Sequence, residues 1–191
     1  MKPSREALLE AYRQCNNLRQ ACAQTGVKPY QAFIWLKKAK LLSLEEKGRY
    51  GTASQRAGGD AEAEFQRLVP QAMPANKVLQ CNNPVYDFDY KGQTIDVKFS
   101  RVNKGHKKNY HPCWRWDLAK HKTEKPDFYA AFLATSETGL LSEGYILLLV
   151  PHDLYDGRAR LSVRPDDPDN ELWEFRVEPS ELASVLAGGG E

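Results

Sequence analysis

The chain has 191 residues, 41% of them hydrophobic, and a formal net charge of +2. This length allows one well-packed core with a small satellite domain, because single domains usually contain about 100–150 residues. No run approaches the ~20 apolar residues that a membrane span needs, and the N-terminus lacks a signal-peptide core, so we expect a soluble, cytoplasmic protein without a membrane partner.

The small net charge hides two basic zones and an acidic tail. Residues 1–59 hold 11 basic and four acidic side chains, residues 98–125 hold nine and two, and residues 152–191 hold four and ten. Basic zones attract polyanions, of which nucleic acid is the usual one, although a merely solvated surface is the alternative. The four cysteines form no CxxC pair, which fits free thiols in a reducing compartment.

Residues 1–44 predict three helices. Ser4 can cap the first helix, which Asn16-Asn17 ends. A short second helix follows and ends at a turn in which Gly26 supplies a positive φ, and Pro29 opens a third helix. This pattern resembles a small all-α helix-turn-helix domain.

The resemblance implies that the third helix, extending to Lys40, enters a major groove. Its outward candidates for phosphate and base contacts are Lys28, Tyr30, Gln31, Lys37 and Lys38. Phe33 and Ile34 occupy positions where polar base-reading residues are common, so they can instead meet thymine methyl groups, a partner subunit or the main domain. A protein-docking module without DNA contact is the rival interpretation.

Residues 45–59 are rich in Gly, Ser, Thr and charge and show no apolar period, which predicts a linker. Asp60 to Val69 then predicts an acidic helix that carries Glu62 and Glu64. Acidic residues are also ordinary in a first helical turn, which is the alternative reading of these glutamates. Lys77 to Cys81 predicts a first strand.

Two amphipathic strands follow and form the most informative stretch of the chain. Tyr86, Phe88 and Tyr90 alternate with Asp87 and Asp89, and then Ile95, Val97 and Phe99 alternate with Asp96, Lys98 and Ser100. Gly92-Gln93 fits a two-residue II′ turn, which sets Asp87 opposite Lys98. The neighbouring choice, Lys91-Gly92, sets Asp87 opposite Asp96 and keeps the acids on one face.

Carboxylates gathered with one ammonium suit a divalent cation and a scissile phosphate. Carboxylates bind Mg²⁺ directly, and a lysine can orient or deprotonate the attacking water or stabilise the phosphorane charge. A solvated sheet face is the alternative for any isolated D-x-K.

Asp87 with Asp96-Val97-Lys98 resembles the PD-(D/E)XK nuclease superfamily, and Glu62 matches the helix glutamate that many members carry. The resemblance covers about residues 58–151; Tyr86 stands where the family has proline, and Asp96 is the less common second acid. It implies an α/β fold with a restriction-endonuclease-like αβββαβ core and a mixed sheet. It also implies metal binding by Asp87, Asp96 and Glu62, Lys98 acting on the water, and Mg²⁺ as cofactor with Mn²⁺ as a substitute.

The remaining segments predict a basic loop and the rest of the sheet. Lys104, Lys107 and Lys108, with His106 among them, are candidates for sequence-independent contacts to a DNA backbone. Trp114 and Trp116 alternate as in a strand, with core packing as the alternative to a binding role. Further predicted elements are strands over 127–134, 145–150, 161–164 and 172–177, then a helix from Pro179-Ser180.

These patterns together predict a helix-turn-helix domain over 1–44, a linker over 45–59 and a nuclease domain over 60–191. The expected activity is Mg²⁺-dependent hydrolysis of DNA phosphodiesters by a restriction, homing or junction-resolving endonuclease. A homodimer is expected if both strands are cut. The alternatives are an inactive DNA-binding protein with a nuclease-like core and an RNA-processing nuclease.

Overall fold

The computed structural model describes residues 4–42, 52–75, 86–103, 111–118 and 125–188. The chain divides into two compact units, Met1–Gly59 and Asp60–Glu191. None of the described helices is both long enough and apolar enough to cross a membrane.

The first unit contains α1 (Arg5–Cys15), α2 (Leu18–Thr25) and α3 (Pro29–Lys38). Ser4 caps α1 by accepting the N–H of Ala7, and Asn17 caps α2 in the same way. Asn16 and Gly26 end these two helices in the left-handed conformation, at φ of 46° and 68°. The three helices enclose a core of buried side chains: Leu8, Tyr12, Leu18, Ala21, Cys22, Val27, Ala32, Leu36 and Leu42.

The helix after this unit begins earlier than the sequence predicts. The segment 45–59 was expected to be a linker, but α5 (Ala53–Leu68) already includes Ala53 to Gly59. The reason is a capping box: the Thr52 N–H donates to Gln55 Oε1 at 2.8 Å, and the Gln55 N–H donates to Thr52 Oγ1 at 3.3 Å. The remainder of the predicted linker, apart from Thr52, lies outside the described residues.

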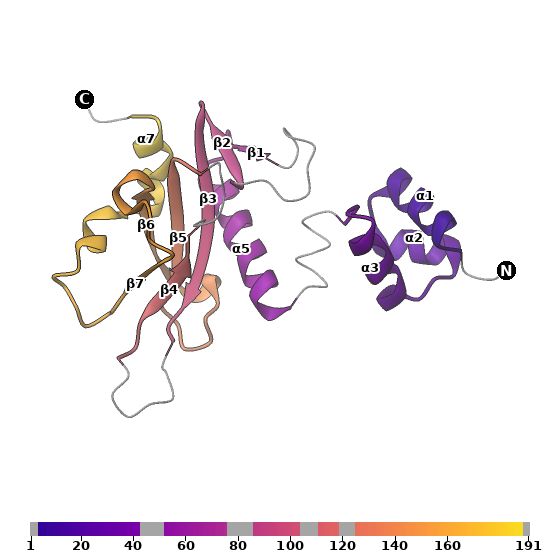
Figure 1. Ribbon diagram of the computed structural model, residues 1–191, viewed down its shortest axis with the longest axis horizontal. Coiled ribbons are helices and arrows are strands. Elements are labelled where there is room, and N and C mark those ends of the chain that lie inside the picture. The colour runs from indigo at the N-terminus through magenta and orange to yellow at the C-terminus, as the bar shows by residue number, and fades with distance from the viewer. Residues whose placement is uncertain (1–3, 43–51, 76–85, 104–110, 119–124, 189–191) are drawn as a thin grey trace. The chain divides into compact units, whose positions relative to one another are not determined.

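The second unit is built on a mixed six-stranded sheet in its described part (Figure 1). Its spatial order is β1 (Met73–Pro74), β2 (Phe88–Tyr90), β3 (Gln93–Arg101), β5 (Phe128–Ala134), β6 (Tyr145–Pro151) and β8 (Arg176–Val177). Strands β3 and β5 pair in parallel, and the other neighbours pair antiparallel.

Each face of the sheet has its own apolar layer. On one face, α5 and α7 (Leu182–Leu186) cover Ile95, Val97 and their neighbours on β5 and β6. On the other face lies a two-stranded ribbon of β4 (Trp114–Asp117) and β7 (Arg160–Val163). Trp114 and Trp116 are buried there, so they pack in the core, as the alternative interpretation held.

Four short 3₁₀ helices complete the described elements: η1 (Leu141–Glu143), η2 (Asp153–Tyr155), η3 (Glu171–Phe175) and η4 (Pro179–Glu181). Strands expected over 127–134, 145–150 and 161–164 are present within a residue or two. The strand expected over 172–177 is wrong for most of its length, because η3 occupies it and only Arg176–Val177 pairs with β6. The strand expected at Lys77 to Cys81 lies outside the described residues.

The predicted αβββαβ order is not what the described residues contain. The connection between the parallel strands β3 and β5 carries β4 in its described part, where that order has its helix, and β5 runs into β6 as an antiparallel neighbour. Our preferred hairpin turn was also wrong. Phe88 pairs with Ile95 and Tyr90 with Gln93, so the turn is Lys91-Gly92, with φ of 53° and 83°. Positive φ at both positions is typical of a type I′ turn.

Candidate active site

The D-x-K segment places an acid and a base side by side on β3. Alternation along the strand turns Ile95 and Val97 into the α5-covered core and Asp96 and Lys98 to the opposite face. Asp96 is only 4% exposed. Lys98 Nζ donates to Asp96 Oδ1 at 2.8 Å and lies 2.7 Å from Oδ2. The ammonium therefore compensates part of the charge of a buried carboxylate.

Asp87 lies beside this pair, at the position just before β2. Its N–H donates to the Ile95 carbonyl at 2.9 Å, while its Oδ2 accepts the Val97 N–H at 2.7 Å. The Asp87 carbonyl in turn accepts the Ala75 N–H at 2.8 Å, which fixes the residue between two neighbouring segments. In the observed register Asp87 is the next position opposite Asp96, the pairing that the Lys91-Gly92 turn produces.

The electrostatics of this site favour a bound cation or a shared proton. Burial raises the pKa of Asp87 well above its ordinary value, and the negative charges of Asp96 and Glu62 raise it further. The hydrogen bond from the Val97 N–H acts in the opposite direction but does not cancel these effects. Because Lys98 already pairs with Asp96, the charge that a bound cation would newly compensate is that of Asp87.

The two glutamates of α5 have different surroundings. Glu64 accepts two hydrogen bonds from Arg67, at 2.7 and 2.8 Å, and one from the Tyr145 hydroxyl at 2.6 Å. The hydrogen bond from Arg67 is the main reason that the pKa of Glu64 is lowered, and burial together with Glu64 raises the pKa of Tyr145 to about 12. Glu62 is the glutamate whose charge acts on Asp87. Glu64 therefore links α5 to β6 through Tyr145. Glu62 is the α5 glutamate that we assign to the candidate active site, beside Asp87.

The two carboxylates of Asp87 and Asp96 suit Mg²⁺ better than a metal that requires three or more protein ligands. Both oxygens of the buried Asp96 carboxylate contact Lys98 Nζ, at 2.8 and 2.7 Å, and no other partner of Oδ2 is present in the described part of the chain. Among the described residues, no three His, Cys, Asp or Glu side chains gather as ready-made metal ligands. Mg²⁺ usually takes one or two carboxylates and completes its shell with waters and substrate phosphates, which matches an Asp87–Asp96 pair.

Two supporting contacts were not foreseen from the sequence. Ser100 Oγ accepts the Arg115 N–H at 2.7 Å and donates to the Arg115 carbonyl at 2.9 Å, so it joins β3 to the β4–β7 ribbon. Asp127 Oδ2 accepts hydrogen bonds from the N–H and the hydroxyl of Thr94, both at 2.7 Å. The second contact fixes the start of β3 to the segment entering β5. Both depend on long-range pairing, for which the sequence carries no local signal.

The expected DNA-contacting residues fall into two groups. Lys28, Tyr30, Lys37 and Lys38 are exposed and Gln31 is half-buried, all on or beside α3. Phe33 is partly buried against the helical core, whereas Ile34 is exposed. The loop residues Lys104, Lys107 and Lys108 lie outside the described residues.

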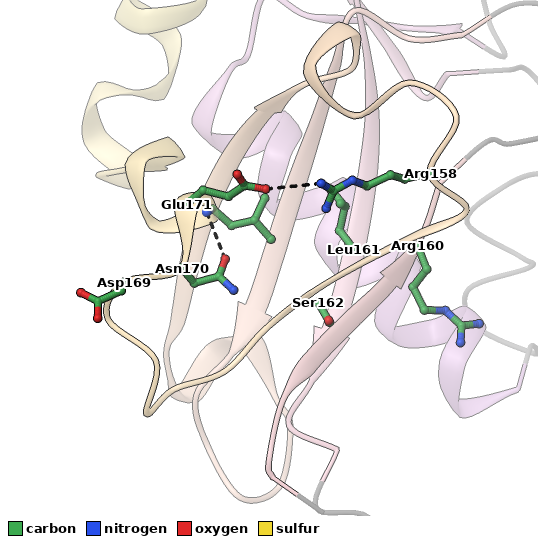
Figure 2. Close-up of a pocket in the computed structure, with 8 residues that line it drawn as sticks. Arg158, Arg160, Leu161, Ser162, Asp169, Asn170 and Glu171 are labelled. Carbon is green, nitrogen blue, oxygen red and sulfur yellow. Dashed lines mark hydrogen bonds and ion pairs between the residues drawn. The ribbon is translucent and has the colours of Figure 1, made fainter.

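A separate hollow lies between β7 and η3, and none of the candidate residues lines it (Figure 2). Its volume is about 370 Å³, and its charged lining includes Arg158, Arg160 and Glu171. Arg158 pairs with Glu171 at 3.8 Å, and Arg160 pairs with Asp117 at 2.5 Å. Because these charges compensate one another on an exposed surface, the hollow offers no evident chemistry.

Comparison with known proteins gives one distant structural similarity. No family model matches the chain, and no curated protein matches its sequence. Among solved structures, the chain is similar to a bacterial homing endonuclease, I-Ssp6803I, at 16% sequence identity and a TM-score of 0.43. The match covers 73% of this chain and 94% of that one.

Proposed function

We propose that the chain is a metal-dependent DNA endonuclease whose active site is formed by Asp87, Asp96 and Lys98, supported by Glu62. The observation that carries this proposal is the pair formed by half-buried Asp87 and buried Asp96, in which both Asp96 oxygens lie beside the Lys98 ammonium and the pKa of Asp87 is raised. A purely structural pair of this kind would be costly, because burial and like charge both raise its free energy. A divalent cation bound between the two carboxylates would offset this cost.

The proposed roles follow from the position of each group. Asp87 and Asp96 would hold Mg²⁺, or Mn²⁺ in its place, and Glu62 would add negative charge or hold a metal-bound water. When bound, the cation supplies Lewis acidity to a scissile phosphate and lowers the pKa of water. Lys98, held by Asp96, can orient that water and stabilise negative charge on the phosphate oxygens, an effect that a poorly solvated site strengthens.

The basic regions extend this proposal to the substrate. We infer that α3 is the recognition helix of a helix-turn-helix domain, with Tyr30 and Gln31 facing bases and Lys28, Lys37 and Lys38 facing phosphates. Lys104, Lys107 and Lys108 would contact phosphates nearer the cut. A homodimer is proposed for double-strand cleavage, since each chain carries one such site and the DNA strands are related by two-fold symmetry.

The test is incubation of the purified chain with supercoiled plasmid, branched DNA and RNA, each with Mg²⁺, Mn²⁺ or EDTA. The proposal predicts nicked or linear DNA with either metal and intact DNA with EDTA. Cleavage of RNA alone would reassign the substrate. DNA binding without cleavage in either metal would contradict the proposed activity and leave a binding protein with a nuclease-like core.

A further inference from the structure

Ile34 lies at the centre of the solvent-facing stripe of α3. The buried residues of this helix are Ala32 and Leu36, and at 100° per residue Ile34 projects almost directly opposite them. It is 47% exposed, and Tyr30, one turn earlier, is 67% exposed. Phe33 is not part of this stripe, because it packs against the helical core. The outward face of α3 thus has an apolar centre.

The neighbours of Ile34 give this stripe a specific chemistry. Tyr30, Gln31, Lys37 and Lys38 stand three or four positions from Ile34, the spacing at which helix side chains adjoin. The segment Pro29–Lys38 contains no acidic residue, and two lysines close its last turn. Single exposed aliphatic residues are common, but one enclosed by an amide, a phenol and two ammonium groups suits a surface that is both apolar and anionic. The major groove of duplex DNA is such a surface.

We propose that Ile34 contacts the C5-methyl group of thymine, while Gln31 beside it faces adenine, so that α3 selects an A·T-containing site in duplex DNA. Thymine presents the apolar group in the major groove, and a glutamine amide pairs with adenine N6 and N7. Gln31 and Ile34 are neighbours on one helix face, so their targets are the same or adjacent base pairs. This inference rests on the proposed function only in requiring that the helical unit binds DNA.

The test uses the full chain with Lys98→Ala in EDTA, so that binding is measured without cleavage. Duplexes are selected from a random library, and the preferred duplex is resynthesised with deoxyuridine at each thymine in turn, which removes the methyl group alone. We expect one such replacement to weaken binding about fourfold, the factor corresponding to burial of one methyl group. With Ile34→Ala added, that difference should vanish. Leu154→Ala, at a residue 63% exposed in the second unit, is the matched control and should preserve it.

Equal affinity for thymine and uracil duplexes in the Lys98→Ala chain, or failure of the library to enrich any site, would overturn the inference. A lower melting temperature or altered oligomer mass for Ile34→Ala, without any change in the thymine-to-uracil ratio, would show that this face packs against protein. The nuclease proposal fails separately. If the Lys98→Ala chain distinguishes thymine from uracil but the unmodified chain does not cleave plasmid, the nuclease proposal is refuted and the contact between Ile34 and thymine is supported. If the unmodified chain cleaves plasmid but thymine and uracil duplexes bind equally, only the proposed Ile34 contact is refuted.

Discussion

At Asp87, burial and then the negative charges of Asp96 and Glu62 raise the free energy of ionising the side chain. The folded state therefore binds a proton at Asp87 more tightly than the unfolded chain, in which an aspartate has a pKa of about 3.9. Stability from this group is fully present below about pH 3.9 and is lost as the pH rises through the higher folded-state pKa. At neutral pH and without a bound cation, Asp87 therefore destabilises the folded state most.

The variant Asp87→Asn tests this directly, because its amide oxygen can still accept the Val97 N–H while the charge is gone. In EDTA, the melting temperature of the wild type relative to Asp87→Asn should fall as the pH rises from about 4 towards neutrality. Each kcal/mol lost should lower it by about 2–4 °C for a chain of this size. Addition of Mg²⁺ at neutral pH should stabilise the wild type more than the variant. A difference in melting temperature between wild type and Asp87→Asn that stays constant across this pH range would contradict the electrostatic account.

The sequence predicts some of these residues better than others. Asp87, Asp96 and Lys98 follow from strand alternation, which survives an error in the turn. The choice between Glu62 and Glu64 could not be made from sequence, because it depends on Tyr145, a residue 81 positions from Glu64. Ser100 was foreseen on the polar face of its strand, but its two hydrogen bonds to Arg115 depend on where β4 lies.

At the scale of elements, the β2–β3 turn determines which residue faces Asp96. Lys91 adopts a φ of 53°, a left-handed conformation that glycine and asparagine adopt at lower cost than lysine. The sequence pattern therefore favoured Gly92-Gln93 as the turn. Both turns leave Phe88 and Tyr90 on the core face, and the observed register differs in placing Phe88 opposite Ile95, and therefore Asp87 at the next position opposite Asp96.

Substitution of Gly92 should therefore weaken the hairpin. Gly92→Ala should lower the free energy of unfolding by about 1–2 kcal/mol, because the alanine must adopt a φ of 83°. No atom lies near enough to clash with the new methyl group, so the backbone conformation is the whole cause. Gly58→Ala in α5 is the matched control: it also has open space, but its helical backbone predicts stabilisation by up to about 1 kcal/mol. Urea unfolding of both variants measures the pair. Equal shifts of the same sign would refute the turn assignment.

The junction between β3 and the β4–β7 ribbon predicts a second change. Ser100→Ala removes the hydroxyl that serves both the N–H and the carbonyl of Arg115, so it should cost about 1–3 kcal/mol. Ser162→Ala, on the exposed side of β7, is a suitable control and should be nearly neutral. Thermal melting distinguishes them. A neutral Ser100→Ala would mean that water replaces the hydroxyl at no cost.

Two elements differ from the sequence prediction because of local side-chain hydrogen bonds to the backbone. The capping box Thr52-x-x-Gln55 was present in the sequence, but the glycines that follow it and the lack of an apolar period pointed to a linker. The segment 172–177 alternates like a strand, yet Asn170 caps Leu172 and begins a 3₁₀ turn instead. Local hydrogen bonds decided both cases.

At the scale of the whole molecule, the chain divides into two units with separate cores, and the net charge of residues 1–59 is strongly positive. Deletion of residues 1–44 keeps Thr52 and all of α5, so the remainder should fold and cleave DNA in Mg²⁺ with weaker affinity and less sequence selectivity. Circular dichroism and binding titrations check this. An unfolded remainder would show that the two units share a core.

The most direct test of the central claim is the single-turnover cleavage rate of Lys98→Ala in Mg²⁺. Arg158→Ala is the matched control, because Arg158 is another cation of the same unit that pairs with an acid, Glu171, at an exposed position. Loss of a group that acts on the water or the phosphate should slow cleavage by ~10²-fold or more. We predict this loss for Lys98→Ala with DNA affinity and circular dichroism unchanged, and wild-type rates for Arg158→Ala. A Lys98→Ala rate within about threefold of wild type would contradict the account, because a group that orients the water and stabilises charge on the phosphate requires a larger effect.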